Sequence, residues 1–503
     1  MKKIKINNIL VNKIFYLLII FSFIIVTLIL YFKPFIQDEG WATSFIVSKI
    51  KYGNPFQNGL IDSFDKLSYR TYYNWFNFIP LEISIRTFGV NILAARIPIL
   101  IYSVLLLISI SYFFRKNFDN NYFVFIPLYL VLMPFFNMHL WTRSEIPASF
   151  FSILAILSIN SNNRYKTFFT ILFLIISFDI HPVSLFLTLP FLLFKFDYKN
   201  ITTFYQGITS SLIGVIVILS SKIQFFEFST SITDFLAKSL HLSGGSDHYS
   251  PIFKISEHDF ITTEKIRLLP FFIHFLPILI LLIFNLKSLS KKNDFKYYFF
   301  SFLTSILLSI LITDTLGNGY QLYMMFVFII FGFYIISNIN LNFINKLTIL
   351  ILIVITLKDW TSSIQSISNN ISNKKKHEKY YSKIESLIPN NTFLAARPQY
   401  FFSSFKKNVK LEYWFTIFLE SNNSNILTNF ENKKYEYLII DKGFEDLIIT
   451  ENKQKSINTL SYYYKNLPSL SELDYNIFLQ SYTLIYSDID PIGQQTKIYK
   501  KNE

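Results

Sequence analysis

The chain has 503 residues, of which 51% are hydrophobic and 19% aromatic, and its mean hydropathy is +0.36. Soluble domains rarely combine such values with many apolar runs near twenty residues, so the composition indicates an α-helical membrane protein. The lack of cysteine excludes disulfides and cysteine-ligated metals. The net charge of +14 is explained by lysines in cytoplasmic loops, and no nucleic-acid partner is expected.

Eleven apolar segments, each bounded by charged or turn residues, are candidate membrane spans. They lie at 14–32, 93–114, 121–137, 146–160, 167–180, 182–196, 202–221, 268–286, 297–313, 320–338 and 343–358. Several are shorter than the roughly 20 residues that a perpendicular helix needs, so one pair of segments could merge into a single span. The predicted fold is a polytopic helical protein of about eleven spans.

Basic residues predict the sidedness of these spans. Lysines ahead of the first span place the N-terminus in the cytoplasm, and the run at 14–32 is too long for the apolar core of a signal peptide. With eleven spans every short basic loop falls on the cytoplasmic side, including "KSLSKKNDFK" at 287–296. The loops at 33–92 and 222–267, and everything after Lys358, then face outward. We expect a multi-pass protein of the cell inner or plasma membrane.

Residues 359–503 lack long apolar runs. The stretch "NNISNKKKHEKYYSKIESLIPNN" is typical of a polar linker followed by an amphipathic helix. The segments "NTFLAARPQYFF", "YEYLIID", "SYTLIYSD" and "QQTKIYKK" read as strands. The predicted organisation is therefore a transmembrane domain over 1–358 and a small extracytoplasmic α/β domain over 359–503.

An acidic pair, Asp38 and Glu39, lies six residues beyond the end of the first apolar run. Asp38 could simply cap an interfacial helix in a solvated loop. Alternatively, ionisable groups close to hydrocarbon are costly and tend to be functional. A carboxylate here could act as a general base that removes a proton from an acceptor hydroxyl while that oxygen attacks a sugar carbon.

The segment 67–98 alternates apolar and aromatic residues with charges at helical spacing. This pattern predicts a helix lying in the plane of the membrane interface, with Tyr73 and Trp75 at headgroup depth. Lys66 and Arg70 could hold a lipid phosphate through charge-assisted hydrogen bonds. The alternative for each cation is ordinary interfacial anchoring.

Other outer turns also carry polar groups. Arg143 and Glu145 form either a surface ion pair of little energetic value or part of the same cavity as the acidic pair. His181 precedes a proline and could be a helix stop or a ligand. Tyr320 and Tyr323 lie one turn apart and could belong to an aromatic belt or contact phosphate and sugar.

The loop at 222–267 gathers residues of metal-ligand type. They are His241, Asp247, His248, Glu257, His258 and Asp259. The neighbouring Ser-Gly-Gly-Ser favours a mobile loop, so no metal site is expected, although a divalent metal is possible. No phosphate-binding loop or dinucleotide fingerprint occurs, so no cofactor is expected.

In their order and common sidedness, these features resemble the glycosyltransferase-C superfamily, and more narrowly the bacterial relatives of protein O-mannosyltransferases and aminoarabinose transferases. The resemblance covers about residues 10–340. It rests on the acidic pair after the first span, "YYNWFNFIPLEISIRTFGVNILAARIP", the turn Arg143–Glu145, His181-Pro182 and "YQLYMMF". The chain departs from the pattern in having Glu145 instead of aspartate, no proline within "YQLYMMF", and no lysine followed by a proline pair.

The resemblance implies a multi-span bundle with two juxtamembrane helices in the first outer loop and an extracytoplasmic C-terminal domain. It implies a glycosyltransferase, with Asp38 as the catalytic base and a sugar on a polyprenyl phosphate as donor. The acceptor would be a glycan, a lipid or a protein at the outer face of the bilayer. The candidate substrate-binding residues are Glu39, Lys66, Arg70, Tyr73, Arg143, Glu145, His181, Tyr320 and Tyr323.

The chemistry of a lipid-linked sugar donor also supports a glycosyltransferase. A sugar on a polyprenyl phosphate cannot leave the bilayer, so a base must be held at headgroup depth and remain open to the acceptor. The lipid phosphate is already a good leaving group and needs a cation rather than a nucleotide site, and Arg143, Arg70 and Lys66 are candidates. Two alternatives remain. A transporter or flippase of lipid-linked sugars would more often show an internal repeat, and an O-antigen polymerase or ligase would depend on arginine and histidine in the loop 222–267.

Overall fold

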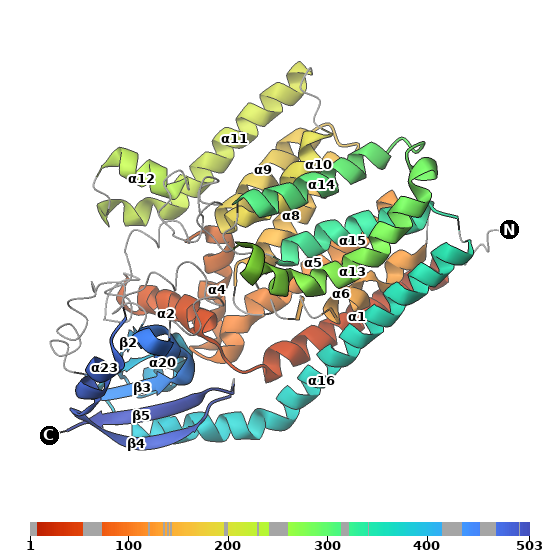
Figure 1. Cartoon of the computed structure of the whole chain (residues 1–503). Helices are drawn as coiled ribbons and strands as arrows, with labels where there is room; N and C mark the ends of the chain where they lie inside the picture. Colours follow the sequence, from red (N-terminus) through yellow and green to blue (C-terminus); the bar gives the residue numbers. More distant parts are fainter. Residues whose placement is uncertain are drawn as a thin grey trace.

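The structure is a computed structural model of the chain. It describes residues 8–53, 73–118, 121–133, 136–137, 140, 143–195, 200–228, 231–240, 260–312, 321–340, 342–414, 435–452, 469–491 and 493–502. A bundle of helices makes up most of the molecule, and a small sheet lies at one end of it (Figure 1). The N-terminus is at the opposite end of the bundle from this sheet.

In the first half of the chain the described secondary structure consists of helices. In order, its elements are α1 (Asn8–Phe32), α2 (Gln37–Tyr52), α4 (Trp75–Phe88), α5 (Ile92–Asn117), η1 (Asn121–Phe125), α6 (Ile126–Val131), α8 (Glu145–Ile159), α9 (Lys166–Ile180), η2 (Pro182–Ser184), α10 (Leu185–Leu193), α11 (Ile201–Lys222), η3 (Ile223–Phe228) and α12 (Ile232–Ser239). Four more helices follow: α13 (Phe260–Leu289), α14 (Phe295–Ile312), α15 (Gln321–Asn338) and α16 (Phe343–Leu387).

Each predicted span falls on one of these helical segments. Four helical stretches are long and apolar enough to cross a membrane, namely Leu10–Phe32, Ile92–Asn117, Ile201–Lys222 and α16. Five described stretches are apolar but shorter: Glu145–Ile159, Pro182–Leu193, Ile273–Leu289, Phe295–Leu308 and Leu322–Asn338. The prediction of a multi-pass helical membrane protein is therefore confirmed, whereas the count of eleven crossings stays a prediction.

Local signals explain how the first outer loop is divided into helices. The Asn74 side chain accepts a hydrogen bond from the amide of Asn77 and caps the start of α4. Gly89 ends α4 with a φ of 79°, a conformation that side chains disfavour. The Asn91 side chain then caps α5 through the amide of Ala94. Within the described residues, α2 and α4 precede the long helix α5. The two juxtamembrane helices that the resemblance implies for this loop stay a prediction, because residues 54–72 lie outside the described part.

The C-terminal part contains a five-stranded sheet in the order β2-β1-β3-β5-β4. Its strands are β1 (Phe393–Ala396), β2 (Lys410–Tyr413), β3 (Tyr437–Asp441), β4 (Tyr482–Ile489) and β5 (Gln495–Lys501). β1 runs parallel to β2 and β3, and β5 pairs antiparallel with β3 and β4. Short helices η5 (Pro398–Tyr400), α17 (Phe401–Lys406), α20 (Lys442–Ile448) and α23 (Glu472–Leu479) complete the described part.

Four of the five strands lie within the predicted segments, whereas β2 was not predicted. The second half of "NTFLAARPQYFF" was wrongly expected to be a strand, since it forms η5 and the start of α17. The expected linker after residue 358 is instead the second half of α16, which runs without interruption for 45 residues into the C-terminal part. A division of the chain at 358/359 therefore stays a prediction, because one helix passes through that boundary.

The juxtamembrane helices and the sheet share one hydrophobic core. This core contains Phe45 of α2, Phe78 of α4, Ile384 of α16 and Ile439 of β3. A Cβ added at Gly40 would lie 1.9 Å from the carbonyl oxygen of Pro398, so the start of α2 touches the backbone of η5. The sheet is thus packed directly against the helix that carries the acidic pair.

Candidate functional site at the juxtamembrane helices

The acidic pair lies at the junction of α1 and α2. Ile36 is the residue that precedes α2, so Asp38 occupies the first turn of the helix and is not its N-cap. The described features do not include the side chain of Asp38. A carboxylate in the first turn is favoured by the helix dipole. The structure thus places position 38 at the end of the first span, and its catalytic role stays a prediction.

Glu39 is completely buried and is held by a single arginine. Arg96 of α5, 2% exposed, donates from Nε to Glu39 Oε1 at 2.7 Å and from Nη2 to Oε2 at 2.6 Å. Glu39 also accepts the backbone N–H of Ile36 at 3.3 Å. These bonds engage both carboxylate oxygens. The predicted contact of Glu39 with substrate stays untested.

Arg96 also binds the chain between α1 and α2. Its guanidinium donates to the carbonyl oxygens of Lys33 at 2.9 Å and Pro34 at 3.1 Å, and to that of Leu30. Buried carbonyl groups need such partners where a helix ends. Arg96 therefore fixes the end of α1 and the start of α2 relative to each other, and so fixes the backbone of position 38.

A lysine lies beside this junction. The ammonium of Lys33 donates to the carbonyl oxygen of Asn137 at 2.8 Å. Burial lowers the pKa of Lys33 well below its ordinary value; Glu39 opposes this shift and Arg96 adds to it. The junction thus carries a cation whose charged form is disfavoured by its surroundings.

Two further sequence candidates form an ion pair. Arg143 Nη2 lies 2.7 Å from Glu145 Oε1, and Arg143 Nε donates to Glu145 Oε2 at 3.2 Å. Glu145 is buried in the first turn of α8, whereas Arg143 keeps 29% of its side chain exposed. The pair can therefore present part of a cation at the surface while its acid stays inside.

His181 and Tyr323 are also brought together. Their rings stack with centroids 5.6 Å apart and an interplanar angle of 26°. Both are buried, so the predicted contact with substrate stays untested. Lys66, Arg70 and Tyr320 lie outside the described residues, as do the histidines and acidic residues at 241–259, where no metal site was expected.

A buried ion pair joins two helices near this histidine. Lys222, the last residue of α11, places its ammonium 2.5 Å from Oδ1 of Asp179 on α9. The same ammonium donates to the carbonyl oxygen of Ser239 in α12 at 2.9 Å. Lys222 was missed by the sequence analysis, although an isolated lysine at the end of an apolar span is itself a signal.

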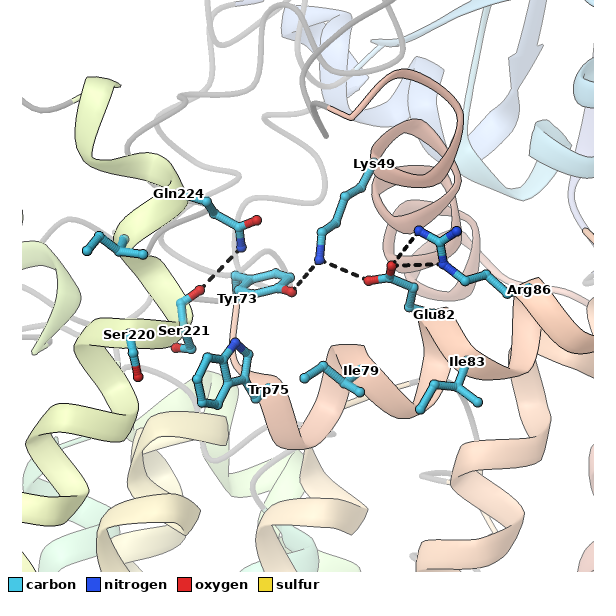
Figure 2. A pocket seen from close by; sticks show the side chains of 11 residues that line it. Lys49, Tyr73, Trp75, Ile79, Glu82, Ile83, Arg86, Ser220, Ser221 and Gln224 are labelled. Atoms are coloured by element: carbon cyan, nitrogen blue, oxygen red, sulfur yellow. Dashed lines mark hydrogen bonds and ion pairs between the residues drawn. The ribbon is translucent and has the colours of Figure 1, made fainter.

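A cavity of about 460 Å³ lies between α2, α4 and the end of α11. Figure 2 shows its side chains. The lining residues are Lys49, Tyr73, Trp75, Ile79, Glu82, Ile83, Arg86, Ser220, Ser221, Ile223 and Gln224. Tyr73 is the only predicted site residue in this lining. The cavity therefore adds an unpredicted set of polar groups to the juxtamembrane region.

The polar side of the cavity is a small network around one carboxylate. Lys49 donates to Glu82 Oε2 at 2.9 Å and to the Tyr73 hydroxyl at 2.8 Å. Arg86 donates from Nε and Nη2 to Glu82 Oε1 at 3.0 and 2.8 Å. Burial alone would lower the pKa of Lys49, but its bonds to Tyr73 and Glu82 raise it. Burial would raise the pKa of Glu82, but Lys49 and Arg86 lower it. The contact between Lys49 and Glu82 thus favours the charged form of each.

Sequence analysis missed most of this network. Glu82 and Arg86 stood out only as charges at helical spacing, and Lys49 was not considered. A signal existed, because Lys49 lies close to one end of a helix whose other end carries the acidic pair. The described residues contain no group of three or more potential metal ligands, and the expectation about cofactors stays untested.

Comparison with solved structures identifies the fold. ArnT from Cupriavidus metallidurans bound to undecaprenyl phosphate aligns with a TM-score of 0.56 and 9% identity, over 96% of this chain and 97% of ArnT. The apo state of ArnT aligns with a TM-score of 0.53 and 10% identity, over 95% and 97% of the two chains. No protein-family model and no curated protein matches the chain.

A third structure also aligns along most of the chain. The archaeal oligosaccharyltransferase AglB from Archaeoglobus fulgidus, in complex with an inhibitory peptide and a dolichol-phosphate, gives a TM-score of 0.48 and 13% identity, over 97% of this chain and 74% of AglB. ArnT, an aminoarabinose transferase, is a member of the glycosyltransferase-C superfamily. The fold expected from the sequence resemblance is therefore confirmed: this chain has the fold of ArnT along nearly its whole length.

Proposed function

We propose that this protein is a membrane glycosyltransferase that moves a sugar from a polyprenyl-phosphate donor to an acceptor at the extracytoplasmic face. The observation that carries the proposal is the fold shared with ArnT, which binds undecaprenyl phosphate. The junction of α1 and α2 adds chemical support. It holds an acidic pair at the end of a span, where the reacting carbon of a lipid-linked sugar would lie.

In this proposal Asp38 is the general base. It would accept a proton from the acceptor hydroxyl as that oxygen attacks the anomeric carbon, and the bond from this carbon to the lipid phosphate would break. The polyprenyl phosphate would leave with the electron pair of that bond. Arg96 would keep position 38 at a constant depth by fixing Glu39 and the preceding turn.

Cations near the junction would stabilise the negative charge on the departing phosphate. Arg143 is the best described candidate, because its guanidinium is partly exposed while Glu145 holds its orientation. Lys66 and Arg70 are the candidates from the sequence. The C-terminal sheet would lie on the extracytoplasmic side together with α2, since the two share one hydrophobic core.

The test is Asp38→Asn in the full-length protein, with Asp446→Asn as the control. Asp446 lies in the C-terminal part and forms a surface ion pair with Lys442 at 3.0 Å. Cells that lack the protein should accumulate unused polyprenyl-linked sugar, and wild type or Asp446→Asn should relieve this. Asp38→Asn should lose transfer while donor lipid still binds. Full transfer by Asp38→Asn would disprove this mechanism.

A further inference from the structure

The cavity between α2, α4 and α11 carries an excess of positive charge. Lys49 and Arg86 share the single carboxylate of Glu82. The remaining polar lining groups are neutral, namely the Tyr73 hydroxyl, two serines and Gln224. Among the described lining residues there are two cations and one anion, a balance that favours an anionic ligand, and the phenol, hydroxyl and amide groups can add hydrogen bonds.

The adjoining wall of the cavity is apolar and faces outward. Trp75, Ile79 and Ile83 repeat every four residues along α4, so they form one row on the helix surface. They keep 36%, 37% and 58% of their surface exposed. Ile223, the first residue of η3, adds an exposed side chain. A helix with an exposed apolar row beside charged groups is suited to the membrane interface, where chains and headgroups meet.

The position of the cavity along α2 limits which group it can bind. Position 49 follows position 38 by eleven residues, which is three helical turns, so both positions share one face of α2. At 1.5 Å per residue they are roughly 16 Å apart along the helix axis. The phosphate that leaves the donor is bonded to the carbon under attack, so it must lie close to the base. An anion at Lys49 is therefore not that phosphate.

We propose that this cavity binds the phosphate headgroup of a membrane lipid that serves as acceptor. This inference rests on the proposed function. Lys49 and Arg86 would bind the phosphate, Arg86 by two parallel N–H···O bonds, and the lipid chain would lie along Trp75, Ile79 and Ile83. The hydroxyl that receives the sugar would then extend along α2 toward position 38.

The test measures which lipid headgroup comes close to Trp75. The full-length protein in phosphatidylcholine nanodiscs is titrated with phosphatidic acid or phosphatidylcholine, each with brominated chains that quench tryptophan fluorescence. The contribution of Trp75 is the difference between wild type and Trp75→Phe. We expect brominated phosphatidic acid to quench Trp75 at concentrations about tenfold lower than brominated phosphatidylcholine. Equal quenching by the two lipids would overturn the proposal.

Variants then assign the selectivity to the cavity. Lys49→Met should lower the preference for phosphatidic acid about tenfold, whereas Lys49→Arg should retain this preference. Lys51→Met is the matched control. Lys51 lies in the same last turn of α2, but its ammonium is over the rings of Tyr52 and Phe405 and does not line the cavity. Selectivity that survives Lys49→Met in a protein with wild-type thermal stability would overturn the proposal.

A competition experiment separates a lipid from a soluble phosphate. Glycerol 3-phosphate should displace the brominated lipid at least tenfold less well than a short-chain phosphatidic acid, because it lacks the apolar chain. Equal displacement would show that the cavity binds a soluble phosphate instead. The binding assay uses no donor and no transfer step. Full transfer by Asp38→Asn would therefore refute the role of Asp38 as the base and leave the binding result unchanged, whereas loss of headgroup selectivity would refute only this inference.

Discussion

Arg96 and Glu39, 57 residues apart in the chain, form a completely buried two-point ion pair at the junction of α1 and α2. Removal of one partner leaves an uncompensated charge in the interior, which costs about 3–5 kcal/mol. We expect Arg96→Met to lower the free energy of unfolding by an amount in this range. Thermal unfolding of the purified protein in detergent measures it.

The matched control for that prediction is Arg86→Met. Arg86 also pairs with a glutamate through two nitrogen atoms, but 55% of its side chain is exposed. Exposed ion pairs contribute about 0–1 kcal/mol. Similar losses of stability in the two variants would contradict the view that burial makes the Glu39 pair important.

A second prediction concerns the contact between α2 and the sheet. Gly40→Ala would place a methyl group 1.9 Å from the backbone oxygen of Pro398, and neither backbone can move aside cheaply. We expect a loss of about 1–3 kcal/mol from this overpacking. Limited proteolysis should cut the C-terminal part faster in the variant, and transfer activity should fall with it.

Gly207→Ala is a suitable control for the Gly40 variant. Its new methyl group would lie 3.3 Å from the Cδ1 atom of Ile171, which is the end of a flexible side chain. Alanine also favours a helix by roughly 1 kcal/mol over glycine. We expect stability to be unchanged or slightly higher. Unchanged proteolysis in Gly40→Ala would argue against a rigid contact between α2 and η5.

A third prediction concerns pH. Burial lowers the pKa of Lys33, so the unfolded chain binds this proton more tightly than the folded chain. The stability contributed by this group therefore rises as pH increases from the folded pKa toward the unfolded value of about 10.4. The thermal midpoint of the wild type minus that of Lys33→Met should increase as the pH rises from 7 to about 10. A difference between the wild type and Lys33→Met that stays constant over this pH range would contradict the prediction.

A fourth prediction uses the buried pair of Asp179 and Lys222. Asp179→Asn leaves the buried ammonium of Lys222 without its counterion and should cost about 3–5 kcal/mol. The double variant Asp179→Asn with Lys222→Met removes both charges and should recover most of this loss. Thermal unfolding of the single and double variants measures the coupling. Additive losses would show that the two residues do not interact.

Much of the fold was predictable from the sequence because its signals are local. Apolar runs located the long helices of the bundle, and short segments rich in β-branched and aromatic residues, "YEYLIID" and "QQTKIYKK", located β3 and β5. The short helix α12 was missed, because it lies in a stretch interpreted as a loop. β2 was missed, since "KLEY" is only four residues long, too short for its alternation of polar and apolar residues to stand out. The length of α16 was also missed, because its polar second half has the composition of a linker.

The candidate site was less predictable because its contacts are long-range. The sequence marked Glu39 as ionisable near the membrane, but only the packing of α5 against α1 reveals that Arg96 satisfies it. Lys49 and Glu82 lie on different helices, and their spacing in the chain carries no sign of an ion pair. A pairing of Arg143 with Glu145, in contrast, was foreseen, since the two residues are neighbours in one turn.

The 45-residue helix α16 has a consequence for how this protein tolerates changes in length. One extra residue in its polar half would turn everything beyond it by about 100° and shift it by about 1.5 Å. The close contact between Gly40 of α2 and the backbone of Pro398 in η5 could not be kept after such a rotation. A single inserted residue should therefore be harmful. Insertions of seven or eleven residues, which complete about two or three helical turns, should be the least disruptive because they restore the orientation of the following segment.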